Sequence, residues 1–187
     1  MTRIISAVLP RLRDRIPRAD SPRGRELTVL FVGINPGVRS AVTGHHFAGF
    51  SNRFWKLLYE SGLVPEPIGY ADDDRLPEWG FGVTNIVPRA TPGIDALRRE
   101  EFVAGRATLR RKIRRHRPPI VAMVGVTVFR AMFPEHRGVV APGFQGQTIG
   151  DSRVFVLPNP SGRNANFTYA EMLAAYRALA RAIRRAS

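Results

Sequence analysis

Four apolar runs, separated by segments with helical spacing, are the feature that most constrains the fold of this chain. Two of them, Glu26 to Val32 and Ile120 to Gly125, are continuous, which is the pattern of strands buried on both faces. The runs at Phe81 to Val87 and Arg153 to Leu157 are also made of residue types that favour strands. Strands that alternate with helices pair in parallel through right-handed crossovers. The sequence therefore predicts an α/β fold, a three-layer α/β/α sandwich around a mostly parallel central sheet.

Helices are predicted in the segments around these runs. We expect them at Phe54 to Ser61, Arg99 to His116, Thr127 to Phe133 and Tyr169 to Arg185, with Gly62 as the C-cap of the first. In parallel sheets, ligands bind beyond the carboxyl ends of the strands. The loops expected there are residues 33–50, 88–97 and 158–167.

The charge of the chain favours a polyanionic partner. It has 29 basic and 15 acidic residues, for a formal net charge of +14. Release of condensed counterions makes nucleic acid the first candidate partner and an anionic membrane surface the second. Because only Lys56 and Lys112 are lysines, a genomic bias toward arginine is an alternative explanation for the surplus.

The composition also excludes several kinds of chemistry. The chain has no cysteine, so it has no disulfide, thiol nucleophile, Cys-ligated zinc or iron–sulfur cluster. Its four histidines lack metalloprotease spacing, and we expect neither a metal nor a cofactor. No apolar run approaches membrane-spanning length, and the N-terminus lacks the features of a signal peptide. We therefore expect a soluble intracellular protein.

The N-terminal region differs from the remainder of the chain. Residues 1–25 contain seven arginines and three prolines, and we expect a short helix or a loose basic arm there. A solvated tail without a function is the alternative. Residues 26–187 show no repeat or linker and are expected to form a single domain.

The loop after the first run, Gly33-Ile34-Asn35-Pro36-Gly37, has the composition of a rigid binding loop. Its glycines allow a flat ligand to approach the backbone, and Pro36 stiffens the turn. Asn35 is then displayed with an amide that both donates and accepts hydrogen bonds. A tight turn with a turn-forming Asn is the alternative. No phosphate-loop pattern is present.

Two later segments carry further candidates for nucleic-acid contact. Phe47 lies between Gly44 and Gly49, where an aromatic side chain stacks on an exposed base or simply packs on the domain. Phe54 and Trp55 are expected in the core. The loop from 158 to 167 is stiffened by two prolines and suits insertion into a duplex. A phosphate-binding role near the N-terminus of the last helix is one interpretation of its small polar residues, and capping of the helix at Thr168 is the alternative.

In combination these motifs resemble a known family. GINPG after the first strand, GHHFAG and NRFWK after it, GVTNIVPRATPG in the middle and NPSG near the end are similar to the mismatch-specific uracil-DNA and thymine-DNA glycosylases. The resemblance extends from about Leu27 to about Tyr176. It implies the uracil-DNA glycosylase fold and an enzyme that flips uracil out of double-stranded DNA with G·U or G·T mispairs and hydrolyses its N-glycosidic bond. A non-catalytic reader of damaged DNA is the alternative.

The resemblance also implies roles for individual residues. Asn35 would position the attacking water, and Phe47 would stack on the flipped pyrimidine. The backbone N–H groups of Ile34 and Phe47 would read the edge of the base, and Ser40 would border its 5-position. The other substrate-binding positions are Gly33, Pro36, Gly37, Asn85 and Asn159, and the DNA-binding positions are Ser161, Gly162, Arg163 and Asn164.

Three further expectations concern Asp95, the two lysines and Arg163. Asp95 is a second catalytic candidate, with an N-cap for a helix beginning near Ala96 as the alternative. Lys56 and Lys112 both lie in predicted helices, Lys56 in a core-like segment, so no lysine is expected to form a Schiff base and the enzyme is expected to be monofunctional. Arg163 departs from both branches of the family and is the expected inserting residue. We expect a cytoplasmic, nucleoid-associated monomer without membrane contact.

Overall fold

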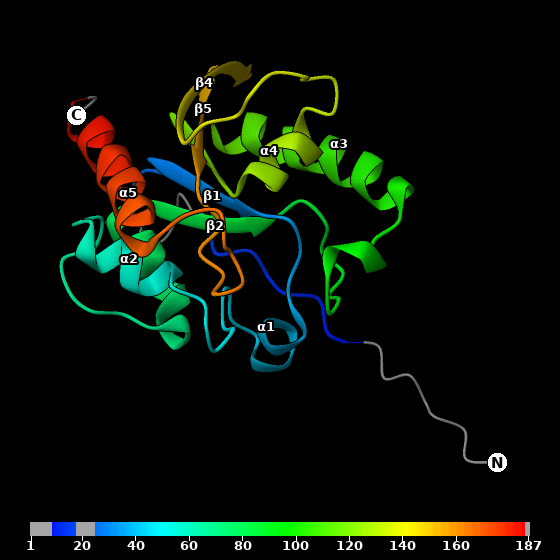
Figure 1. Cartoon of the computed structure of the whole chain (residues 1–187), viewed down its shortest axis with the longest axis horizontal. Helices are drawn as coiled ribbons and strands as arrows, with labels where there is room; N and C mark the ends of the chain where they lie inside the picture. Colours follow the sequence, from blue (N-terminus) through cyan, green and yellow to red (C-terminus); the bar gives the residue numbers. More distant parts are fainter. Residues whose placement is uncertain (1–8, 18–24, 186–187) are drawn as a thin grey trace.

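The predicted runs form the parallel part of a five-stranded sheet. The computed structural model describes residues 9–17 and 25–185. The strand order is β2-β1-β3-β5-β4, and β2, β1, β3 and β5 form its parallel part. Figure 1 shows β1 beside β2 and β4 beside β5. The α/β class and the mostly parallel sheet are therefore confirmed. The strands are β1 Val29–Gly33, β2 Phe81–Asn85, β3 Ile120–Val124, β4 Gly143–Ile149 and β5 Ser152–Leu157.

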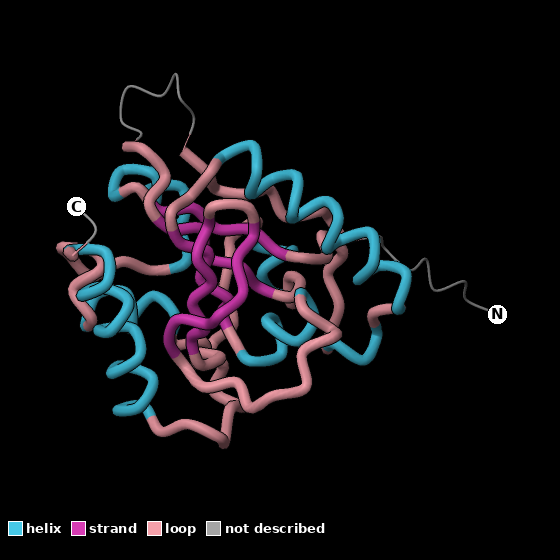
Figure 2. Tube along the Cα trace, turned by 90° about the horizontal axis from the view of Figure 1, so that it is seen from above, coloured by secondary structure: helices cyan, strands magenta, loops and turns pink. Residues whose placement is uncertain are grey.

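Helices cover both faces of this sheet (Figure 2). Successive strand residues point to opposite faces, so Phe31 packs with α2 and α5 while Leu30 packs with α3 and α4. Both side chains are fully buried. The helices are α1 Val38–Thr43, α2 Phe54–Glu60, α3 Arg99–His116, α4 Val126–Met132 and α5 Tyr169–Arg184, with 3₁₀ segments η1 Tyr70–Trp79 and η2 Ile94–Ala96.

The sequence did not predict β4, α1 or the 3₁₀ segments. β4 is an antiparallel edge strand, partly or fully exposed over most of its length, and so lacks a continuous apolar run. Phe54 and Trp55 are buried, as expected. Lys56 was placed in a core-like segment, which is wrong, because its side chain is 65% exposed and pairs with Glu60. None of the helices in the part of the chain described is long and apolar enough to cross a membrane.

Residues 9–17 lie against the sheet rather than forming a helix or a loose arm. Arg15 pairs with Val83 of the edge strand β2 through two backbone hydrogen bonds of 3.0 and 2.6 Å. Asp14 accepts a hydrogen bond from Thr84 Oγ1 at 2.6 Å and forms an ion pair with Lys112 of α3. This segment therefore protects the β2 edge of the sheet. Residues 1–8 and 18–24 of the predicted arm lie outside the described residues.

Candidate functional site

A cavity of about 370 Å³ lies beyond the carboxyl ends of the parallel strands. Such a position is where ligands bind in open α/β sheets. Each parallel strand contributes its following loop to the lining. The lining includes Gly33, Ile34, Asn35, Pro36, Gly37, Ser40, Phe47, Asn85, Gly125, Asn159 and Ser161, together with Leu12 from the N-terminal segment.

The orientation of the Asn35 amide is fixed by its neighbours. Nδ2 donates to Arg89 O at 3.0 Å, Thr91 Oγ1 at 2.7 Å and Pro36 O at 3.2 Å. Two of these partners are carbonyl oxygens, which only accept hydrogen bonds, so the nitrogen must face them. Among the residues that the structure describes, Oδ1 accepts no hydrogen bond. The side chain therefore presents a fixed acceptor at the wall of the cavity.

The loop that contains Arg89 and Thr91, the hydrogen-bond partners of the Asn35 amide, is itself anchored to α3. The Arg89 guanidinium donates to both carboxylate oxygens of Glu101 on α3, at 2.7 and 2.8 Å. This hydrogen bonding holds the pKa of Glu101 at about 2, well below its usual range. Thr91 Oγ1 also donates to Gly93 O at 2.7 Å. Thr91 was not predicted as a site residue, although it lies in the loop of residues 88–97, which the sequence places at the ligand-binding edge of the sheet.

Phe47 is held in an unusual conformation at the cavity. Its φ of 51° lies in the left-handed region, which costs a bulky residue on the order of 1–3 kcal/mol. The ring stacks on Phe54 with centroids 4.1 Å apart and an interplanar angle of 28°. Ser40 Oγ accepts the Ala48 N–H at 3.1 Å and fixes the adjacent backbone. The aromatic face at the cavity is thus supported from behind by the core.

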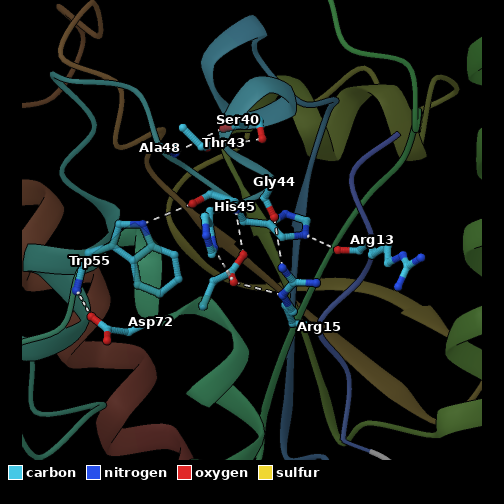
Figure 3. A network of polar contacts seen from close by, with 12 residues as sticks. Arg13, Arg15, Ser40, Thr43, Gly44, His45, Ala48, Trp55 and Asp72 are labelled. Atoms are coloured by element: carbon cyan, nitrogen blue, oxygen red, sulfur yellow. Dashed lines mark hydrogen bonds and ion pairs between the residues drawn. The ribbon is translucent and has the colours of Figure 1, made fainter. Parts of the chain in front are cut away.

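A buried carboxylate, Asp73, secures the loop that carries Phe47. Figure 3 shows the polar contacts around Arg15 and His45. Asp73 has no solvent exposure and accepts the His46 N–H at 2.8 Å. It also pairs with Arg15 Nε at 2.9 Å and lies 3.0 Å from His45 Nδ1. Trp55 Nε1 donates to His46 O at 3.2 Å. The N-terminal segment, η1 and α2 therefore all hold this loop in place.

Burial also determines the pKa of His46. Its Nε2 lies 2.9 Å from Arg13 O, and a carbonyl only accepts, so Nε2 carries the proton. Burial lowers the pKa of His46 below its ordinary value of 6.5. Well above pH 6.5 the folded and unfolded chains both hold it neutral. Below this value the unfolded chain binds a proton that the folded chain takes up only at lower pH.

We therefore expect the free energy of unfolding to fall as the pH decreases below 6.5. Urea unfolding at pH about 7.5 and about 5.5 measures the fall. The His46→Gln protein keeps an amide donor for Arg13 O but does not titrate, so its fall should be smaller. Equal falls in the two proteins would contradict this assignment.

Gly33 leaves room for the close approach of the Asn85 side chain. A Cβ at Gly33 would lie 2.5 Å from Asn85 Oδ1 and 3.7 Å from Phe47 Cζ. A contact of 2.5 Å is not sterically possible, so the Asn85 side chain would have to move. The position thus brings the amide of Asn85 and the ring of Phe47 together at one end of the cavity.

The loop after β5 is fixed by its own hydrogen bonds. Asn159 Oδ1 accepts the Ser161 N–H at 3.0 Å, and Asn159 O accepts from Asn164 Nδ2 at 2.8 Å. A Cβ at Gly162 would lie 2.5 Å from Ser51 Cβ, so the loop packs closely on residues 51–53. Arg163 is exposed, and within the described ranges its side chain forms no hydrogen bond or ion pair.

The last helix does not use Ser161 or Gly162 at its N-terminus. Thr168 is the N-cap of α5, and its side chain accepts the Glu171 N–H at 3.2 Å. The helix is therefore capped at Thr168, as the alternative expected, and a phosphate contact by Ser161 and Gly162 stays a prediction. Ser161 instead lines the cavity.

The structure does not bring Asp95 into the cavity. This residue is exposed in η2, whose N-cap is Gly93, and α3 begins only at Arg99. The expected N-cap role of Asp95 is therefore wrong. Neither lysine lines the cavity: Lys56 lies at the surface, and Lys112 donates to Thr84 Oγ1 at 2.7 Å. Among residues 9–17 and 25–185, no group of three or more metal-binding side chains is close enough to hold an ion.

A larger hollow of about 720 Å³ lies between residues 9–14 and α3. It shares Leu12 and Asn85 with the cavity, but neither Asn35 nor Phe47 lines it. The fixed amide and the aromatic face meet at the smaller cavity, which is therefore the better candidate for a site with chemistry.

A fixed amide and a supported aromatic face beyond the carboxyl ends of a parallel sheet are suited to binding a flat heterocycle. A family model described as "Uracil DNA glycosylase superfamily" matches residues 22–180. The chain belongs to the uracil DNA glycosylase superfamily, whose members are DNA glycosylases of base excision repair that hydrolyse N-glycosidic bonds.

Proposed function

We propose that this chain is a monofunctional glycosylase of the mismatch-specific uracil and thymine branch. It flips uracil out of double-stranded DNA, preferentially opposite guanine, and leaves an abasic site. Thymine in G·T mispairs and other damaged pyrimidines are further candidate substrates. The observation that carries the proposal is the Asn35 amide, which is oriented by three hydrogen bonds beside Phe47 in a cavity of about 370 Å³.

The proposed reaction begins with eversion of the nucleotide. Eversion costs a few kcal/mol and costs least at a mispair, which favours uracil opposite guanine over uracil opposite adenine. Phe47 offers the flipped base a rigid stacking surface because Phe54 supports its ring at 4.1 Å.

Bond cleavage then requires stabilisation of the departing pyrimidine anion. Backbone N–H groups of Ile34 and Phe47 are the proposed donors to its oxygen, and a preorganised donor is effective because it needs no rearrangement during the reaction. Asn35 is neutral and cannot act as a strong base. Its Oδ1 would accept a hydrogen bond from water and orient it toward the anomeric carbon.

Two further residues bear on the choice of substrate and product. Ser40 is buried at the cavity wall and its Oγ accepts the Ala48 N–H, which supports the proposal that it borders the 5-position of the base. Lys56 and Lys112 lie outside the cavity lining, which supports a product that is an intact abasic strand.

The proposal is tested with end-labelled oligonucleotides. Duplexes with G·U, A·U or G·T and a single strand with uracil are incubated with the protein and then treated with alkali. Cleavage that depends on alkali, fastest for G·U, is the expected result. Absence of cleavage in every substrate would refute an enzymatic function, and cleavage without alkali would refute a monofunctional one.

Arg163 is proposed to enter the space that the flipped base vacates. The Arg163→Ala protein should bind the abasic product about tenfold more weakly, with little change in the salt dependence of binding. Arg115→Ala, which removes an exposed arginine from α3, is the matched control. Anisotropy titrations at several salt concentrations give both quantities. A change confined to the salt slope would instead make Arg163 a phosphate contact.

A further inference from the structure

A second cleft of about 420 Å³ lies next to the cavity and shares Phe47, Gly49 and Asn52 with it. The two hollows therefore meet along one loop. The cleft is rich in aromatic side chains: Phe50, Tyr59 and Tyr70 line it in addition to Phe47. Two of these aromatic residues are not packed in the protein core: Phe50 is 89% exposed and Tyr59 is 41% exposed.

The charged side chains that line this cleft are both basic, and one of them, Lys56, pairs with Glu60 at 3.6 Å. Arg39 and Lys56 are its charged lining residues, and none of the residues that line it is an aspartate or glutamate. Arg39 is held in place: its Nε donates to Ala48 O at 2.6 Å, and its guanidinium lies 3.6 Å from the centroid of the Phe50 ring. An exposed aromatic residue alone is common on protein surfaces. An exposed ring with a fixed cation, on the rim of a candidate base pocket, is the combination that binds single-stranded nucleic acid.

We infer that this cleft binds the nucleotide that neighbours the flipped pyrimidine on the same strand. The inference rests on the proposed function, because it requires a nucleotide in the adjoining cavity. The neighbouring base would stack on Phe50, and its phosphate would lie near Arg39 and Lys56. Since every base has a π-face, such a subsite tolerates any neighbouring sequence. It would favour substrates in which the neighbour unstacks easily, such as single strands and frayed ends.

A cycle of substitutions in the protein and in the DNA tests this subsite. Oligonucleotides carry 2′-fluoro-arabino-uracil, which resists hydrolysis, and the base on its 5′ or 3′ side is either present or replaced by an abasic spacer. Dissociation constants are measured by anisotropy for the wild type and for Phe50→Ala. The Phe50 side chain is almost fully exposed, so its removal should leave the fold intact.

In the wild type, removal of the neighbouring base on one side should weaken binding about fivefold to tenfold. In Phe50→Ala the same removal should weaken binding less than about twofold, and Phe50→Trp should restore the larger effect. Val139→Ala is the matched control, because Val139 is 93% exposed and lies outside both linings.

Equal losses in the wild type and Phe50→Ala on both sides of the uracil would overturn the inference. So would a Phe50→Ala defect that is the same with and without the neighbouring base. These experiments distinguish a failure of the neighbour subsite from a failure of the proposed glycosylase function. A wild type that cleaves uracil-containing DNA without showing this coupling overturns only the neighbour subsite, and one that cleaves no substrate overturns the proposed function.

Discussion

The Asn35→Ala protein is expected to release uracil from a G·U duplex about 100- to 1,000-fold more slowly than the wild type. The substitution removes an amide that three hydrogen bonds hold at the cavity wall, and with it the acceptor that would orient water. Its affinity for the duplex should remain nearly unchanged, because the amide acts on the reacting atoms rather than on the phosphate backbone.

Single-turnover rates and anisotropy titrations separate these two effects. Asn166→Ala is the matched control, since Asn166 is exposed in the loop after β5 and only its backbone takes part in a hydrogen bond. Thr91→Val should give a smaller loss than Asn35→Ala, because it removes one of the three partners that orient the amide. Rates equal to those of the wild type in Asn35→Ala would remove this residue from its proposed role.

The Asp73→Ala protein is expected to lose about 3–5 kcal/mol of its free energy of unfolding. Asp73 is fully buried and is the partner of the Arg15 guanidinium and the His46 N–H. Truncation leaves these donors without their acceptor inside the protein, and an unpaired buried charge is costly. Urea unfolding gives the change from the midpoint and the slope.

The neighbouring carboxylate provides the control for this substitution. Asp72 accepts the Gly69 N–H at 2.8 Å at the surface, so Asp72→Ala should cost only about 1 kcal/mol. If Asp73→Ala does not fold, Asp73→Asn keeps the shape of the side chain, and the same comparison with Asp72→Asn is made. Equal losses at the two positions would show that burial of the ion pair does not determine its contribution.

The parts of the fold that the sequence predicted are those that local patterns encode. Continuous apolar runs identified β1 and β3, and helical spacing with flanking prolines gave the bounds of α3 as the structure has them. β4 escaped because an edge strand that is partly exposed has no such run. The position of residues 9–17 was not predicted because it depends on one backbone pairing with β2 and on long-range ion pairs with η1 and α3.

The site shows the same division. Asn35 lies in the motif GINPG and Phe47 in the motif GHHFAG, both after the first strand. The structure places both residues at one cavity. Asp73 lies in a run of three aspartates, and the sequence alone does not indicate which one is buried. Asp95 was expected to cap a helix because the position of the helix start was misjudged, since α3 begins at Arg99.

The N-terminal segment links the shape of the cavity to the start of the chain. Leu12 lines the cavity, Arg13 O accepts from His46, and Arg15 joins β2 to the loop that carries Phe47. A version of the chain that begins at residue 18 would therefore lose a wall of the pocket as well as positive charge. We expect that shortening the basic terminus would therefore also change the shape of the cavity.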